Sequence, residues 1–140
     1  MRADFYLIAK PRFRDQPLLL VCELARRGHD SGKPMLILAR DQPQAEAIDD
    51  LLWSFDPDAY IPHQIAREDD PGEDVPVLIA SPEIAAALRP LTLNLRDQAV
   101  DGPVERILEV VPADPTAREP LRQRWRAYQA RNFQLNKHDM

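Results

Sequence analysis

Short apolar runs recur along the chain and are separated by stretches of helical periodicity. The uniformly apolar runs are Phe5–Ala9, Pro34–Ala39 and Val77–Ala80. Uniform apolarity over four to six residues is typical of strands that are buried on both faces, as in parallel sheets. Arg106–Val111 is predicted as a further strand, ended by Pro112.

One run alternates instead of being uniformly apolar. Leu91, Leu93 and Leu95 are interleaved with Thr92, Asn94 and Arg96. Period-two alternation predicts a strand with one face on the core and one in water.

The helical stretches lie between these runs. Asp15 with Pro17 predicts a helix start, and that helix should continue to Arg27 and end at Gly28. Asp41 is predicted to cap a second helix reaching Phe55, and Asp114 a last one. The inward face of the second helix should consist of Ala45, Ile48, Leu51, Leu52 and Phe55. The proline-rich, acidic segment up to residue 76 reads as loop, with a short extended piece at Ala59–Ile61.

Strands alternating with helices predict an α/β fold with a mainly parallel sheet flanked by helices. A length of 140 residues suits a single domain over 1–140, in which 118–135 form a terminal basic and aromatic helix and tail.

The terminal helix places positive charge beside a large ring. At about 100° per residue, Arg118, Arg122 and Arg126 form one stripe, while Ala117, Leu121 and Tyr128 form the neighbouring apolar arc. Trp125 falls on the seam between the two. Such a seam suits a ligand with both an apolar group and negative charge. The other interpretation is an ordinary amphipathic helix in which Trp125 closes the core.

A second aromatic group lies near the middle of the chain. Trp53 points away from the inward arc of its helix, and Tyr60 and Pro62 follow shortly after. Either Tyr60 and Pro62 fold back over Trp53, or these rings form a partner-binding patch, since exposed Trp and Tyr are common interface anchors.

Charge and composition narrow the function classes. The net charge is −5, which argues against a surface built mainly to hold nucleic acid. The single cysteine, Cys22, indicates a reducing compartment, and no apolar stretch approaches a membrane span. We therefore expect a cytoplasmic protein that does not contact membranes.

The usual signatures of catalysis are missing. Only four glycines occur, none in a phosphate-binding pattern, and Lys10–Pro17 after the first strand contains none. His29, His63 and His138 have no cysteine or carboxylate at ligand spacing, so we expect no metal site. Cys22 lies in an apolar helix and reads as structural, and Lys137–Asp139 reads as a terminal tail without fixed geometry. No cofactor and no catalytic residue is assigned.

Four segments in register resemble one known family. They are Asp4–Leu7, Leu51–Trp53, Tyr60–His63, and Arg122–Tyr128 followed by Asn132–Leu135. Together they make the chain similar, over essentially its whole length, to the chi subunit of bacterial DNA polymerase III holoenzyme.

The resemblance implies a Rossmann-like fold without a working nucleotide site, and an accessory subunit that is not itself an enzyme but is part of the DNA-directed DNA polymerase holoenzyme. It implies binding to the psi subunit of the clamp loader on one side. On another side it implies binding to the acidic C-terminal tail of single-stranded-DNA-binding protein, which ends in phenylalanine. Contact with nucleic acid would then be mainly indirect.

The family's site residues carry over by position. Tail binding falls on Arg118, Arg122, Trp125 and Arg126, with Trp125 where tyrosine is usual and Arg126 where lysine is usual. Psi binding falls on Trp53 and Tyr60, where phenylalanine is common at the latter position, with Pro62 as a neighbour. Asn132 replaces a usual glycine, and because Asn tolerates positive φ, the turn before Phe133 should persist.

Two other functions stay open. The same Arg and Trp side chains suit the phosphates and stacked bases of single-stranded nucleic acid. The α/β fold also admits a divergent nucleotide-dependent enzyme, although the missing glycines disfavour it.

Overall fold

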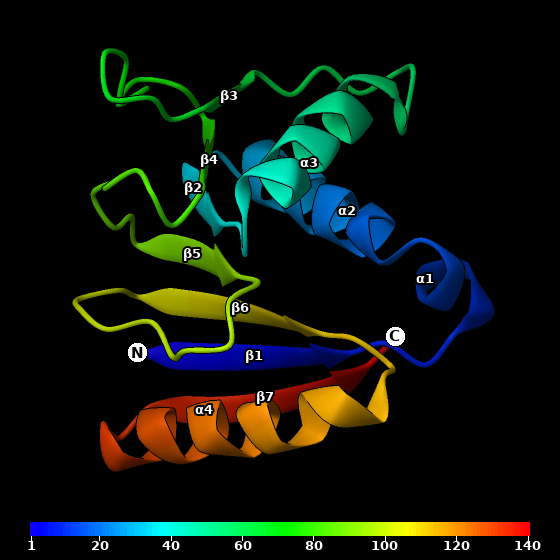
Figure 1. The fold of residues 1–140 in the computed structure, drawn as a ribbon, viewed down its shortest axis with the longest axis vertical. Coiled ribbons are helices and arrows are strands. Elements are labelled where there is room, and N and C mark those ends of the chain that lie inside the picture. The colour runs from blue at the N-terminus through cyan, green and yellow to red at the C-terminus, as the bar shows by residue number, and fades with distance from the viewer.

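A sheet of seven parallel strands organises the protein, as the computed structural model of residues 1–140 shows (Figure 1). The strands are β1 (Arg2–Leu7), β2 (Met35–Leu38), β3 (His63–Ile65), β4 (Val77–Ala80), β5 (Leu91–Asn94), β6 (Arg106–Val111) and β7 (Gln134–Asp139). The helices are α1 (Pro11–Asp15), α2 (Pro17–Asp30), α3 (Gln42–Ser54), the 3₁₀ turn η1 (Pro115–Ala117) and α4 (Arg118–Ala130). The strand order is β3-β4-β2-β5-β6-β1-β7. The predicted α/β fold with a parallel sheet is confirmed.

Alternate residues of each central strand pack into two apolar clusters, one on each face of the sheet. On β2, Met35 and Ile37 belong to the cluster under α1, α2 and α3, whereas Leu36 and Leu38 belong to the cluster under α4. Because both faces are covered, β2 and β4 are apolar throughout rather than alternating. Figure 1 shows α4 alongside β1 and β7, at the opposite end of the sheet from α3.

The predicted cap of α3 and the predicted position of Pro17 in the first turn of α2 are confirmed, whereas the predicted cap and end of α2 are wrong. Asp41 accepts a hydrogen bond from the Gln44 backbone N–H at 2.8 Å, which satisfies one free donor of the first turn. Asp15 instead ends the short helix α1, and α2 begins at Pro17 without a side-chain cap. Asp114 also acts as a cap, but of the 3₁₀ turn η1 that precedes α4: its side chain accepts a hydrogen bond from the Thr116 backbone N–H at 2.9 Å.

Gly28 lies inside α2, which continues to Asp30, and does not terminate the helix. A Cβ at this position would approach Met35 Cε within 3.1 Å and Leu91 Cδ2 within 3.2 Å. The glycine therefore allows close packing of α2 on β2 and β5 rather than a change of backbone direction.

The prediction of a wet face on β5 is wrong. Thr92 and Asn94 are both buried. The Thr92 hydroxyl donates to the Arg89 carbonyl at 2.8 Å, and the Asn94 amide donates to the Gln98 carbonyl at 2.9 Å. Polar side chains that are satisfied inside the protein produce the same alternation as a solvent-exposed face.

The extended piece predicted at Ala59–Ile61 does not form a strand, and β3 begins after it at His63. Pro62 lacks an N–H group and only accepts, from Val77 N–H at 3.2 Å. The residue pairs between β3 and β4 begin one residue past the proline, with His63 opposite Val77.

Residues 134–139 form the edge strand β7, so the prediction of an unstructured tail at Lys137–Asp139 is wrong. Strand β7 pairs in parallel with β1 over its whole length. The turn that leads into β7 contains Asn132 at φ 62°, the positive φ that the sequence predicted for this position.

Candidate functional site

A pocket of about 300 Å³ opens between α4 and the strands β1 and β7. Trp125 forms part of its wall and is half-buried, with its ring centroid 5.0 Å from that of Phe5. The indole is therefore anchored on one side and accessible on the other. The lining residues are Phe5, Leu7, Leu121, Arg122, Trp125, Arg126 and Lys137.

Two of the three arginines predicted to bind the tail line this pocket. Arg122 and Arg126 line it, whereas Arg118, further toward the N-terminus of α4, is exposed but lies outside the lining. Arg122 has one exposed carboxylate neighbour, Glu119, at 3.8 Å, and an exposed pair of this kind contributes roughly 0.2–1 kcal/mol. Arg118 and Arg126 form no ion pair. These guanidinium groups are thus free to meet an anion.

Sequence reasoning missed three members of the pocket. Phe5 and Leu7 come from β1, and Lys137 comes from β7. The resemblance had marked Asp4–Leu7 as a family segment, but nothing in the spacing tied it to α4. Lys137 lies in the segment predicted as a tail, and it reaches the pocket because that segment forms the strand β7.

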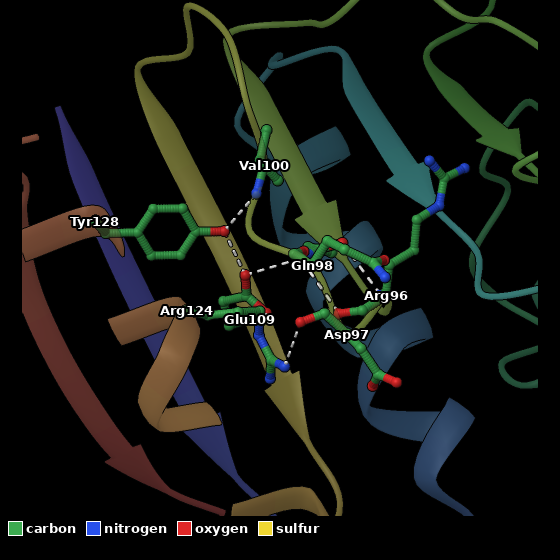
Figure 2. A network of polar contacts seen from close by, with 8 residues as sticks. Arg96, Asp97, Gln98, Val100, Glu109, Arg124 and Tyr128 are labelled. Carbon is green, nitrogen blue, oxygen red and sulfur yellow. Dashed lines mark hydrogen bonds and ion pairs between the residues drawn. The ribbon is translucent and has the colours of Figure 1, made fainter. Parts of the chain in front are cut away.

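A buried polar network fixes α4 against the sheet (Figure 2). Glu109 of β6 is fully buried and accepts from Arg124 Nε at 2.9 Å and from the Tyr128 hydroxyl at 2.6 Å. The Asn94 amide donates to the same carboxylate at 2.9 Å. The Tyr128 hydroxyl accepts from Val100 N–H at 2.9 Å, so its own hydrogen is directed to Glu109. Every oxygen of the buried carboxylate therefore has a donor.

Burial raises the pKa of Glu109 to about 7, against the opposing effects of Arg124, Asn94 and Tyr128. Burial, together with the neighbouring carboxylate, also raises the pKa of Tyr128. The sequence did hold a signal for this network. Arg124 lies on the apolar side of α4, three residues after Leu121 and four before Tyr128, and Glu109 interrupts an apolar strand.

The second aromatic group is exposed on the surface at the far end of the sheet. Trp53 is 57% exposed and Tyr60 72% exposed, with ring centroids 6.4 Å apart. Pro62 is half-buried beside them. Tyr60 therefore contacts Trp53 without covering it, and an apolar patch stays open to a partner. We call Trp53, Tyr60 and Pro62 the aromatic patch.

Two of the three histidines meet carboxylates that sequence spacing did not pair with them. His63 Nε2 lies 3.3 Å from Asp49 Oδ1, and His138 Nε2 lies 3.1 Å from Asp4 Oδ1. Burial raises the pKa of Asp4, but hydrogen bonds from His138, Arg106 and Arg2 outweigh it, so the net effect lowers that pKa. This cluster ties β7 to β1.

The crevice at the carboxyl ends of the strands is where Rossmann-like folds bind nucleotides. Here its lining includes Asp97 and Asp114 as well as arginines. The Arg96 guanidinium is occupied by the carbonyls of Ala39 at 2.9 Å and Ala80 at 3.1 Å. Pro17 opens α2 and offers no N–H for a phosphate. These features do not favour an anionic cofactor.

Other reactive groups are embedded in structure. Cys22 is buried, and burial raises its pKa to about 12, which disfavours the nucleophilic thiolate. No group of three or more His, Cys, Asp and Glu side chains is arranged to hold a metal ion. None of the helices combines the length and apolarity that crossing a membrane requires.

Comparison with known proteins gives a consistent result. A family model described as "DNA polymerase III chi subunit, HolC" matches residues 1–136. "DNA polymerase III subunit chi" of Pseudomonas aeruginosa is 33% identical over 142 aligned positions, covering 98% of this chain and 95% of that protein. The protein of the same name from Escherichia coli is 32% identical over 120 residues, covering 84% and 81%. That of Haemophilus influenzae is 27% identical over 122 residues, covering 84% and 83%.

Proposed function

The chain belongs to the DNA polymerase III chi subunit family, and from that membership we propose that it links the clamp loader to single-stranded-DNA-binding protein. In this proposal the aromatic patch binds the psi subunit of the clamp loader. The pocket beside α4 binds the acidic C-terminal tail of single-stranded-DNA-binding protein. The chain carries no reaction of its own and works in the cytoplasm, with nucleic acid contacted mainly through its partners.

One observation carries the tail-binding half of the proposal: the accessible face of Trp125 lies in a pocket whose rim is cationic. A terminal phenylalanine ring placed against the indole and Leu121 would contribute about 1.5–3 kcal/mol when fully buried. Exposed ion pairs add roughly 0.2–1 kcal/mol each. Ring burial therefore provides most of the affinity, and we expect a dissociation constant on the order of micromolar.

The cations flank the pocket from two elements. Arg122 and Arg126 project from α4, and Lys137 projects from β7. A ligand whose apolar side chain and carboxylate belong to the same terminal residue matches this arrangement, because the ring enters the pocket while the carboxylate stays at the charged rim. Arg118 lies outside the lining, and we assign it to acidic residues earlier in the tail.

The aromatic patch supports the psi-binding half. Trp53 and Tyr60 expose large apolar area in a protein whose other large apolar side chains are mostly covered. Exposed Trp and Tyr that lie together are the residues most often found as interface anchors. The patch is on α3 and the loop before β3, while the pocket is between α4 and β7, so both partners can bind at once.

Peptide and oligonucleotide titrations test the tail site. The chain has two tryptophans, so the Trp53→Phe variant is used to make Trp125 the only reporter of indole emission. We expect saturable quenching or shift by an acidic peptide ending in phenylalanine, weakening as salt rises. The matched control is the same peptide ending in alanine, which should bind at least about tenfold more weakly because the ring contribution is lost.

Direct binding of single-stranded DNA is the competing function, since Trp125 and the arginines would also suit a stacked base and its phosphates. An oligonucleotide that bound more tightly than the peptide at physiological salt would overturn tail recognition. Binding of neither ligand would remove the pocket from the proposed function altogether.

A further inference from the structure

Strand β3 is the edge strand at the end of the sheet opposite α4 (Figure 1). It pairs only with β4. The Pro62 carbonyl accepts a hydrogen bond from β4 at 3.2 Å, and the Ala66 N–H donates one to β4 at 2.8 Å. Successive residues of a strand direct their backbone groups to alternate sides, so Gln64 also faces β4. The backbone groups of His63 and Ile65 therefore point away from the sheet.

These outward backbone groups are open to another chain. His63 as a whole is 9% exposed although its side chain has no exposed surface, so the part that remains accessible is main chain. The N–H and C=O groups of His63 and Ile65 have no hydrogen-bond partner within the protein. The open edge ends at Arg67, whose N–H donates to the Asp70 carbonyl at 2.9 Å. Two donors and two acceptors thus stand in a row on which a further strand can pair.

The aromatic patch adjoins this open edge. The Trp53 ring centroid lies 4.4 Å from that of His63, and Trp53, His63 and Ile65 line one cavity of about 310 Å³. A segment paired with β3 would direct alternate side chains toward the exposed indole. We propose that the partner of the aromatic patch adds an extended segment to β3 as an eighth strand and packs an apolar side chain of that segment against Trp53. This inference rests on the proposed function, because it describes how the psi subunit is held.

The charge around the edge defines the chemistry of the added segment. Arg67 is the only Lys or Arg within residues 46–74. Carboxylates from α3 and from the loop after β3 line the cavity or lie next to it: Asp49, Asp50, Glu68, Asp69 and Asp70. Opposite charges attract across an interface and like charges are costly. The added segment therefore carries Lys or Arg beside its apolar anchor.

A second copy of this chain does not match the edge. Two β3 strands paired about a two-fold axis would bring two acidic loops together. The pocket beside α4 has the reverse character, because its rim is formed by Arg122, Arg126 and Lys137. The two ends of the sheet therefore select ligands of opposite charge, an acidic tail at α4 and a basic extended segment at β3.

Residue-resolved amide hydrogen exchange of the full chain, alone and with the psi subunit, tests the added strand. We expect the His63 and Ile65 N–H groups to exchange at least about tenfold more slowly in the complex, because each would donate to the added strand. The Ala66 N–H, which already donates to β4, is the internal control. Psi binding without protection of His63 and Ile65 overturns strand addition and leaves the proposed function standing. Absence of psi binding removes the proposed function and this inference together.

Ile65→Pro removes one outward donor and none of the donors that face β4. Ile65→Ala is the matched control, because it loses the same half-buried side chain and keeps the N–H group. We expect Ile65→Pro to bind psi at least about tenfold more weakly than Ile65→Ala. Equal affinity of the two variants, with both folded, overturns the proposal. If Ile65→Pro does not fold, the amide exchange of the unmodified chain decides.

Asp69→Lys tests the basic character of the added segment. Asp69 is exposed in the loop after β3, and Asp30→Lys, at the exposed end of α2, is the matched control. We expect Asp69→Lys to weaken psi binding about fivefold at low salt, with a smaller effect as salt screens the charges. Equal effects of the two variants, or no effect of either, overturn the assignment of a basic segment.

Discussion

Arg124 and Arg126 stand two residues apart on α4 and meet opposite environments. Arg124 is buried and donates from Nε to Glu109 Oε1 at 2.9 Å. Arg126 is exposed, unpaired, and lines the pocket beside Trp125. One helix thus uses the same side-chain chemistry to hold itself on the sheet and to present charge to a ligand.

Substituting the two arginines should separate stability from binding. Arg124→Ala leaves the Glu109 carboxylate buried without its cation, and we expect the free energy of unfolding to fall by about 3–5 kcal/mol. Arg126→Ala should change it by less than about 0.5 kcal/mol, as surface substitutions do. Urea denaturation measures both. Equal losses in the two variants would contradict the division of roles.

The raised pKa of Glu109 predicts a pH dependence of stability. The pKa of Glu109 in the folded protein, about 7, lies above the ordinary glutamate value of 4.5, so the folded protein binds one more proton than the unfolded chain between these two pH values. The stabilising contribution is complete below about pH 4.5 and is lost as pH rises through 7. We expect a decline on the order of 1 kcal/mol per pH unit within this window.

Glu109→Gln removes the titrating group and is the control for that slope. The variant itself is less stable, because Arg124 loses its charged partner. Its free energy of unfolding should nevertheless vary less with pH than that of the wild type between roughly pH 5 and 7, where the raised pKa of Glu109 acts. If the free energy of unfolding of the wild-type protein varied as little with pH as that of the variant, the three hydrogen-bond donors would be keeping Glu109 ionised over the whole window.

Lys137 should increase the affinity for a peptide with a free C-terminal carboxylate more than the affinity for an acidic peptide that lacks one. We expect Lys137→Ala to weaken binding of the acidic, phenylalanine-ended peptide by up to about fivefold, the equivalent of one exposed ion pair. A C-terminally amidated peptide should bind both proteins equally. Lys33→Ala, which removes an exposed lysine outside the pocket, is the matched control. Equal weakening for both peptides would assign Lys137 to general charge attraction.

Trp53→Ala should weaken capture by the psi subunit while tail-peptide binding is unchanged. Truncation of a central interface tryptophan typically costs about 2 kcal/mol or more, roughly a thirtyfold loss of affinity. Trp125→Ala should show the reverse pattern in the same two assays. Loss of both activities in Trp53→Ala, with a lower unfolding midpoint, would mean that Trp53 supports the fold instead.

Prediction from sequence succeeded where one physical rule dominates. Strands β2 and β4 are apolar because both faces are covered, and their uniform runs indicated this from the sequence. Asp41 was recognisable as a cap because few residues satisfy a free backbone donor. The half-buried position of Trp125 followed from helical spacing, since its angle places it between the apolar arc and the arginines.

Prediction from sequence failed where tertiary contacts determine the local structure. Strand β7 has one apolar side chain, Leu135, and a single neighbouring strand, so its sequence carries no hydrophobic pattern. Asn94 is polar and buried because hydrogen-bond partners inside the protein satisfy its amide, and one of them, the Glu109 carboxylate, belongs to the neighbouring strand β6. The complete pocket could not be predicted from the sequence for the same reason, because Lys137 belongs to it only when β7 lies beside β1.

Strand β1 lies between β6 and β7, so its two neighbours are residues more than a hundred positions further along the chain. During synthesis β1 therefore has no pairing partner until β6 has been made, and it gains its second neighbour only with β7. The pocket wall that Phe5 contributes is therefore complete only after α4 and β7 have left the ribosome. Premature termination before β6 would leave a nascent chain in which the apolar strand β1 is unpaired, a substrate for chaperones and proteases rather than a partial binder.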